Sequence, residues 1–126
     1  LLDGAHNPAG AKALARHLDE TATPHVLVFG AMRDKHIKEM AEELFPKARR
    51  VVATRVRMTR AATTAYLALV GESLGAKVVE EPSYRRAVAR AARLARPGET
   101  VVVAGSLYLV GAVRKLLLQK SPRKKP

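Results

Sequence analysis

Short apolar runs alternate along this chain with stretches whose apolar residues recur at helical spacing. The runs at residues 26–29, 51–53 and 100–104 contain almost no polar residue, which is typical of strands covered on both faces. Residues 77–80 form a further expected strand, near an edge of the sheet because charged residues flank it. Strands that alternate with helices build βαβ units, whose strands are parallel. The pattern predicts an α/β, Rossmann-like fold with a mainly parallel sheet of five to six strands and helices on both faces.

The helical stretches are amphipathic, so each has an apolar face that can pack on the sheet. In the third stretch, Tyr66, Leu69 and Val70 share one face. No internal repeat and no long linker divides the chain. We therefore expect one domain over residues 1–120, followed by a basic, disordered tail at residues 121–126.

The composition argues against disulfide-bonded, cysteine-dependent and membrane-spanning proteins. The 126 residues suffice for one compact domain with a core. The chain has no cysteine, which excludes disulfides, thiolate metal sites and cysteine nucleophiles. No apolar run approaches the roughly 20 residues that span a bilayer. We expect a cytoplasmic protein without a membrane segment and without a metal site on these residues.

The chain is strongly basic, with a formal net charge of +12. Such a balance can attract nucleic acids, acidic membranes or anionic substrates. The basic residues are scattered, apart from Arg55, Arg57 and Arg60 in an expected loop at residues 54–64 and a run in the tail. Aromatic residues make up only 4% of the chain and Trp is absent, so the stacking surfaces of single-strand binders are scarce. We expect no nucleic-acid partner, and a stand-alone basic module that binds a nucleotide or nucleic acid remains the alternative.

The first stretch that can carry chemistry is Asp3-Gly4-Ala5-His6-Asn7-Pro8. The two leucines before it have the character of a strand end, and Gly4 permits a sharp turn. Asn7 can cap a helix and Pro8 suits its first position. At the carboxyl edge of a parallel sheet, where ligands bind, this turn gathers an acid, an imidazole and an amide beside the free N–H groups of a helix start.

Two further turns follow strands at the same edge, at residues 30–36 and 105–108. Each supplies a glycine and polar side chains, so the three turns can line one crevice. Lys35 is either a charge for an anionic ligand or a solvated residue, and Ser106 either donates to a carboxylate or caps the last helix. Neither a Walker A nor a Gly-x-Gly-x-x-Gly pattern is present, so the domain lacks the usual means of binding a nucleoside triphosphate alone.

No residue is predicted to be catalytic. Ser106 lies in Gly-Ser-Leu-Tyr-Leu, which lacks the second glycine of a nucleophile elbow. His25 precedes a strand and is expected at the opposite end of the sheet, and His17 is expected on the outer face of the first helix. These positions argue against a Ser-His-Asp hydrolase.

The three turns have a further property when they are taken together with their flanking residues. The stretches are Asp3-Gly4-Ala5-His6-Asn7-Pro8, Phe29-Gly30-Ala31-Met32-Arg33-Asp34-Lys35 and Ala104-Gly105-Ser106-Leu107-Tyr108-Leu109-Val110-Gly111. Their type, order and separation resemble the C-terminal domain of folylpolyglutamate synthases and dihydrofolate synthases, in the Mur ligase superfamily. The resemblance spans Asp3 to about Arg114. It implies an ATP-dependent ligase that converts a substrate carboxylate to an acyl phosphate, which the amino group of L-glutamate attacks to give an amide.

The resemblance also implies roles and partners. Asp3 would contact the ATP ribose, His6 and Asn7 would lie near the nucleotide, Lys35 near the phosphates or a substrate carboxylate, and Ser106 near the glutamate. The substrates would be L-glutamate and a folate or dihydropteroate. An upstream P-loop domain, absent from this sequence, would hold most of the ATP and the Mg²⁺ ligands. We therefore expect a piece of a longer enzyme that is inactive alone, with another Mur-type amino-acid ligase as the alternative.

Overall fold

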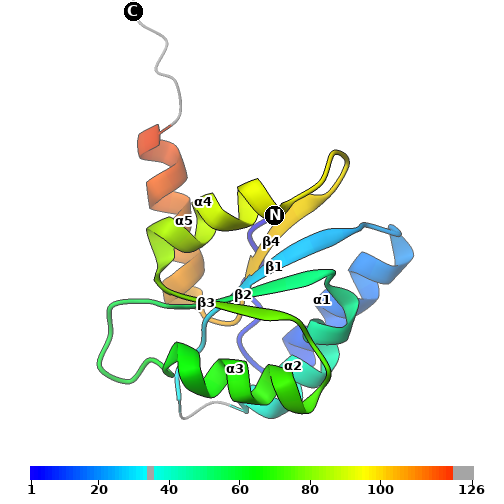
Figure 1. Cartoon of the computed structure of the whole chain (residues 1–126), viewed down its shortest axis with the longest axis horizontal. Helices are drawn as coiled ribbons and strands as arrows, with labels where there is room; N and C mark the ends of the chain where they lie inside the picture. Colours follow the sequence, from blue (N-terminus) through cyan, green and yellow to red (C-terminus); the bar gives the residue numbers. More distant parts are fainter. Residues whose placement is uncertain (34–35, 121–126) are drawn as a thin grey trace, which may run out of the picture.

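The computed structural model describes residues 1–33 and 36–120, and a single sheet organises them (Figure 1). Among these residues the sheet has four strands, in the spatial order β3-β2-β1-β4. They are β1 (His25–Phe29), β2 (Arg50–Arg55), β3 (Val78–Ser83) and β4 (Thr100–Ala104). Every pairing is parallel, with Leu27 of β1 opposite Val51 of β2 and Val102 of β4. The predicted α/β class with a parallel sheet is confirmed.

Helices cover both faces of this sheet. They are α1 (Pro8–Glu20), α2 (Ile37–Leu44) with the short 3-10 helix η1 (Phe45–Lys47), α3 (Thr64–Ser73), α4 (Tyr84–Leu94) and α5 (Leu107–Lys120). Figure 1 shows α4 and α5 on one side of the sheet and the other helices on the opposite side. Alternate residues of β1 serve the two layers, because Leu27 and Phe29 belong to one apolar cluster and Val26 and Val28 to the other. Within residues 1–33 and 36–120, no helix is both long enough and apolar enough to cross a membrane.

The sheet has fewer strands than the five to six that the sequence predicts. The strand expected at Leu1 and Leu2 is reduced to an isolated parallel bridge between Leu2 and Val103. The N–H of Val103 donates to the Leu1 carbonyl at 2.8 Å, and the N–H of Asp3 donates to the Val103 carbonyl at 3.0 Å. The regular ladder ends there, because the next N–H along, that of Gly105, donates to the Ala5 carbonyl at 2.9 Å, two residues beyond its regular partner Asp3. The start of the chain therefore lies beside β4, but its pairing is too short to count as a strand.

Strand β1 is central, and all five of its residues are buried. At its carboxyl end, Phe29 packs edge to face against Phe45 of η1, with ring centroids 5.2 Å apart and ring planes at 86°. This arrangement is a favourable one for aromatic pairs. Burial of one such side chain contributes about 1.5 to 3 kcal/mol. The pair therefore fixes the end of β1 from which the second candidate turn emerges.

The buried face of α3 differs from the face that the apolar periodicity indicates. Of the three residues expected on the buried face, Val70 is buried, but Tyr66 and Leu69 are 43% and 63% exposed. Leu67, which was not among them, is fully buried. Gly71 explains the difference, because a Cβ at this position would lie 2.3 Å from the side chain of Val78 on β3. The helix packs closely against β3 at Gly71, where there is no side chain. Tyr66 and Leu69, on the other side of the helix, remain at the surface.

An ion pair closes the amino edge of the sheet. The guanidinium of Arg49 donates to both carboxylate oxygens of Glu99, at 2.6 and 2.8 Å, and the backbone N–H of Arg96 donates to the same carboxylate at 2.7 Å. The hydrogen bonds from Arg49, followed by the one from Arg96, lower the pKa of Glu99 to about 2. His25 is buried at this end of β1, away from the three turns, as predicted.

Candidate functional site

The three turns meet at the carboxyl edge of the sheet. The first precedes α1, the second follows β1 at Gly30, and the third follows β4 at Gly105. The N–H of Gly105 donates to the Ala5 carbonyl at 2.9 Å, and the N–H of Gly30 donates to the Ala104 carbonyl at 3.4 Å. Backbone hydrogen bonds thus join the first turn to the third and the second to the end of β4. The turns form one continuous edge, as the sequence predicts.

Gly105 is the most constrained backbone position of this edge. Its φ of +113° lies in a region that side chains rarely adopt. A Cβ there would lie 2.4 Å from the carbonyl oxygen of Gly30 and 2.9 Å from the ring of Phe29. The close approach of the second and third turns therefore depends on the absence of a side chain at residue 105.

Asp3 and Asn7 shape the first turn from within. The Oδ1 atom of Asp3 accepts a hydrogen bond from the N–H of Ala5 at 2.9 Å. The Oδ1 atom of Asn7 accepts one from the N–H of Gly10 at 2.8 Å, which makes Asn7 the predicted N-cap of α1. In each side chain, the Oδ1 atom therefore accepts a hydrogen bond from the backbone. The second carboxylate oxygen of Asp3 and the amide nitrogen of Asn7 are the atoms that can serve a ligand.

His6 has a defined orientation in the same turn. Its Nδ1 lies 2.8 Å from the carbonyl oxygen of Gly4. A carbonyl only accepts, so Nδ1 carries the proton of the neutral ring and Nε2 is left as an acceptor. Neutral His6 can therefore accept from a ligand hydroxyl through Nε2, and protonated His6 can donate to an anion from the same atom.

Two shallow hollows lie on either side of His6. A hollow of about 320 Å³ is lined by Asp3, Gly4, Ala5, His6, Asn7, Gly10, Ala13, Leu14 and His17. A second hollow, of about 330 Å³, is lined by His6, Met32, Gly105, Ser106, Leu107 and Tyr108. Both open at the carboxyl edge, and His6 belongs to both. This edge is where parallel α/β sheets bind ligands.

Ser106 caps α5. Its Oγ accepts hydrogen bonds from the N–H groups of Tyr108 at 3.1 Å and Leu109 at 3.3 Å, and the residue is only 2% exposed. The capping role that the sequence allows is therefore present. A hydroxyl that accepts through its oxygen still has a proton to donate, so the cap and a contact with a ligand carboxylate are compatible.

Four of the five predicted site residues lie at this edge, and two further residues line it. The structure brings together Asp3, His6, Asn7 and Ser106, whereas Lys35 lies outside the described residues. Met32 and the 58% exposed Tyr108 also line the edge, and sequence reasoning gave them no role. Their only signal is their position inside the second and third turns. In the described part of the chain, no three His, Asp or Glu side chains gather as metal ligands.

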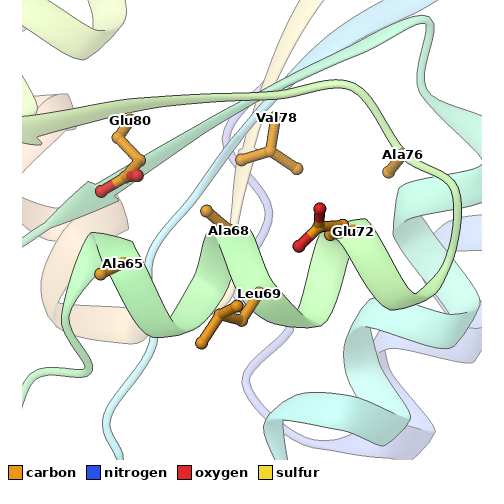
Figure 2. A pocket seen from close by; sticks show the side chains of 7 residues that line it. All are labelled: Ala65, Ala68, Leu69, Glu72, Ala76, Val78 and Glu80. Carbon is orange, nitrogen blue, oxygen red and sulfur yellow. The ribbon is translucent and has the colours of Figure 1, made fainter.

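A larger hollow, of about 600 Å³, lies away from this edge, between α3 and the edge strand β3 (Figure 2). Short side chains such as Ala65 and Ala68 leave the space open, and the carboxylates of Glu72 and Glu80 lie beside it. Its charge is opposite to what an anionic ligand needs. We therefore place the functional site at the three turns.

The fold and the edge define an α/β domain whose ligand crevice is built from strand ends and the starts of α1 and α5. The family model described as "Mur ligase, glutamate ligase domain" matches residues 1–107. The chain belongs to this family. The resemblance carried by the three turns is thereby confirmed.

Three longer proteins are similar to this chain over most of its length. The chain is 38% identical, over 90% of its length, to a probable bifunctional folylpolyglutamate synthase/dihydropteroate synthase of Haloferax volcanii, and 30% identical, over 94%, to a folylpolyglutamate synthase of Lacticaseibacillus casei. A crystal structure of Mycobacterium tuberculosis folylpolyglutamate synthase complexed with ADP and AMPPCP superposes on 96% of the chain, with a TM-score of 0.83 and 33% identity. The chain spans 14%, 27% and 30% of these three proteins, respectively.

Proposed function

We propose that this chain is the C-terminal domain of an ATP-dependent ligase that adds L-glutamate to a folate, a folylpolyglutamate synthase. The observation that carries the proposal is that two backbone hydrogen bonds, from Gly105 to Ala5 and from Gly30 to Ala104, join the three turns into one edge. The likeness to the ADP-complexed mycobacterial enzyme supports it. A dihydropteroate acceptor would give dihydrofolate synthase chemistry at the same edge, and another Mur-type acceptor is the alternative.

The chemistry proceeds in two steps. The substrate carboxylate attacks the γ-phosphorus of ATP, which forms an acyl phosphate and releases ADP. The amino group of L-glutamate then attacks the acyl carbon, loses a proton and expels phosphate, which leaves an amide. Both steps bring anions together, so a basic domain with helix N-termini at the cleft lowers their mutual repulsion. The contribution of this chain is positioning and charge stabilisation.

Each residue of the edge has a role in this proposal. The unused carboxylate oxygen of Asp3 accepts from a ribose hydroxyl, and His6 and Asn7 lie beside the nucleotide. Ser106 donates to a carboxylate of the incoming glutamate, beside the start of α5. Lys35, which lies outside the described residues, is proposed to neutralise the phosphates or a substrate carboxylate. The geometry of the first turn supports these roles because each side chain keeps one polar atom for a ligand.

We assign the Mg²⁺ ligands and the P-loop to an upstream domain of the same protein. The described residues have no cluster of metal-ligating side chains, and one oxygen of Asp3 is already committed to its turn. The metal would supply charge neutralisation on the transferred phosphoryl group. We propose a cytoplasmic location, a domain at residues 1–120 and a basic tail after it.

The role of Asp3 can be tested in the complete enzyme. Asp3→Asn keeps an oxygen for the N–H of Ala5 and removes the charge, whereas Asp3→Ala removes both. We expect both variants to raise the KM for ATP, by about tenfold or more if a charge-assisted hydrogen bond is lost. Asp3→Asn should keep the wild-type Tm. Asp19→Asn, an exposed acid on α1, is the matched control, and an unchanged KM for ATP in both Asp3 variants contradicts the assignment.

A further inference from the structure

A further hollow lies at the carboxyl edge, at the ends of β2 and β3. It measures about 280 Å³ and is lined by Arg55, Arg57, Pro82, Ser83, Tyr84 and Arg85. We call it the arginine hollow. Arg55 is the last residue of β2, Arg57 lies in the segment after it, and Arg85 belongs to the first turn of α4. The parallel register, which pairs Arg55 with Ser83, brings these separate segments together.

The arginine hollow carries uncompensated positive charge. Within the described part of the chain, Arg55, Arg57 and Arg85 form no ion pair, and all three are exposed. The acids of the adjoining strand are engaged elsewhere: Glu80 accepts from the Thr64 hydroxyl at 3.0 Å, and Glu81 lies 3.8 Å from Arg90. The N-terminus of the 11-residue α4 adds the positive end of a helix dipole. This combination favours an anionic ligand.

The arginine hollow and the three turns share one edge of the sheet. The second and third turns follow β1 and β4, and the first follows Leu2, which pairs with β4. The hollow lies at the ends of β2 and β3, and the strand order is β3-β2-β1-β4. Adjacent strands are about 4.8 Å apart, so the two places are separated by about 10 to 15 Å along the edge. An extended anionic chain that starts at the three turns can therefore reach the hollow.

We propose that the arginine hollow binds the γ-linked oligoglutamate tail of the substrate. The inference rests on the proposed function, because repeated addition of glutamate lengthens a chain that gains one free carboxylate per unit. A γ-linked unit has two more backbone atoms than an α-linked residue, which spans about 3.5 Å, so a few units bridge the distance. Guanidinium groups bind carboxylates through two parallel hydrogen bonds, which suits arginine to this ligand.

A nucleic acid is the competing polyanion, and the composition of the hollow does not favour it. Single-strand binders place successive bases on aromatic rings. The arginine hollow has one ring, that of Tyr84, and the guanidinium of Arg85 already lies 5.8 Å from its centre. The three arginines line one compact hollow of about 280 Å³. A short carboxylate chain matches this arrangement better.

Binding to the purified 126-residue chain gives the first test. The probe is a fluorescently labelled γ-linked pentaglutamate, and free L-glutamate serves as the short reference. We expect Arg55→Gln, Arg57→Gln and Arg85→Gln each to weaken pentaglutamate binding about twofold to fivefold. Arg93→Gln, which removes the same charge from the far end of α4, should leave it unchanged. Equal losses for all four variants, or no pentaglutamate binding by the wild type, overturn the proposal. A single-stranded oligonucleotide that binds more tightly through the same arginines also overturns it.

The complete enzyme separates this inference from the proposed function. The assay compares the KM for a monoglutamyl folate with the KM for a tetraglutamyl folate. We expect the arginine variants to raise the ratio of the tetraglutamyl KM to the monoglutamyl KM, because only the longer tail reaches the hollow. An unchanged ratio in an active enzyme refutes the hollow alone. A complete enzyme that adds no glutamate to any folate refutes the proposed function itself.

Discussion

Gly105→Ala tests whether the close packing of the turns holds the functional edge together. Positive φ costs a residue with a side chain about 1 to 2 kcal/mol. The new Cβ would also lie 2.4 Å from the Gly30 carbonyl oxygen, which belongs to backbone and cannot rotate away. Relief of such overlap costs about 1 to 3 kcal/mol. We expect a loss of about 2 to 5 kcal/mol from a stability of 5 to 15 kcal/mol that is typical of domains.

Gly75→Ala is the matched control for this prediction. Gly75 has a φ of +72°, and a Cβ there meets nothing within 4 Å, so only the conformational cost of about 1 to 2 kcal/mol applies. Urea unfolding followed by circular dichroism gives both values on the same chain. If Gly105→Ala destabilises the chain no more than Gly75→Ala does, the turns are not held in the close contact described above.

Two further predictions use other contacts. Ser106→Ala and Thr63→Ala each remove a helix cap and should each cost about 1 kcal/mol of stability in urea unfolding, but only Ser106→Ala should raise the KM for L-glutamate in the complete enzyme. Equal KM values in both variants would refute the glutamate contact. The pKa of Glu99 falls from 4.5 to about 2 on folding, so its stabilising contribution is present above pH 4.5 and is lost as the pH falls toward 2. Urea midpoints measured across that window should fall less for Glu99→Gln than for the wild type, and parallel curves would refute the account of the Arg49 pair.

Strands β1, β2 and β4 could be predicted because each contains an unbroken apolar run, whereas β3 has only two valines before two acids. β1, for example, is buried on both faces and has no competing helical pattern. The buried face of α3 could not be predicted, because it depends on Gly71, whose missing side chain is needed only when β3 lies against it. The strand count was overestimated for a related reason. Leu1 and Leu2 have the composition of a strand, but their pairing with β4 is limited to one bridge, between Leu2 and Val103.

In the candidate site too, features set by neighbouring residues could be predicted, whereas features that depend on strand pairing could not. The cap formed by Asn7 follows from a local pattern and was predicted. The use of one Asp3 oxygen within its own turn is also local, but several turn geometries fit the sequence, and only the structure selects one. The arginine hollow joins Arg57 to Arg85 through the register of β2 and β3, and no local pattern specifies that register.

Release of ADP that depends on both L-glutamate and a folate is the most direct test of the central claim. The measurement compares the complete enzyme with the purified 126-residue chain under the same conditions. We expect the complete enzyme to release ADP only when both substrates are present, and the 126 residues alone to release none. Release by the isolated chain, or release by the complete enzyme that does not depend on glutamate, would contradict the assignment of this chain as the C-terminal domain of a glutamate ligase.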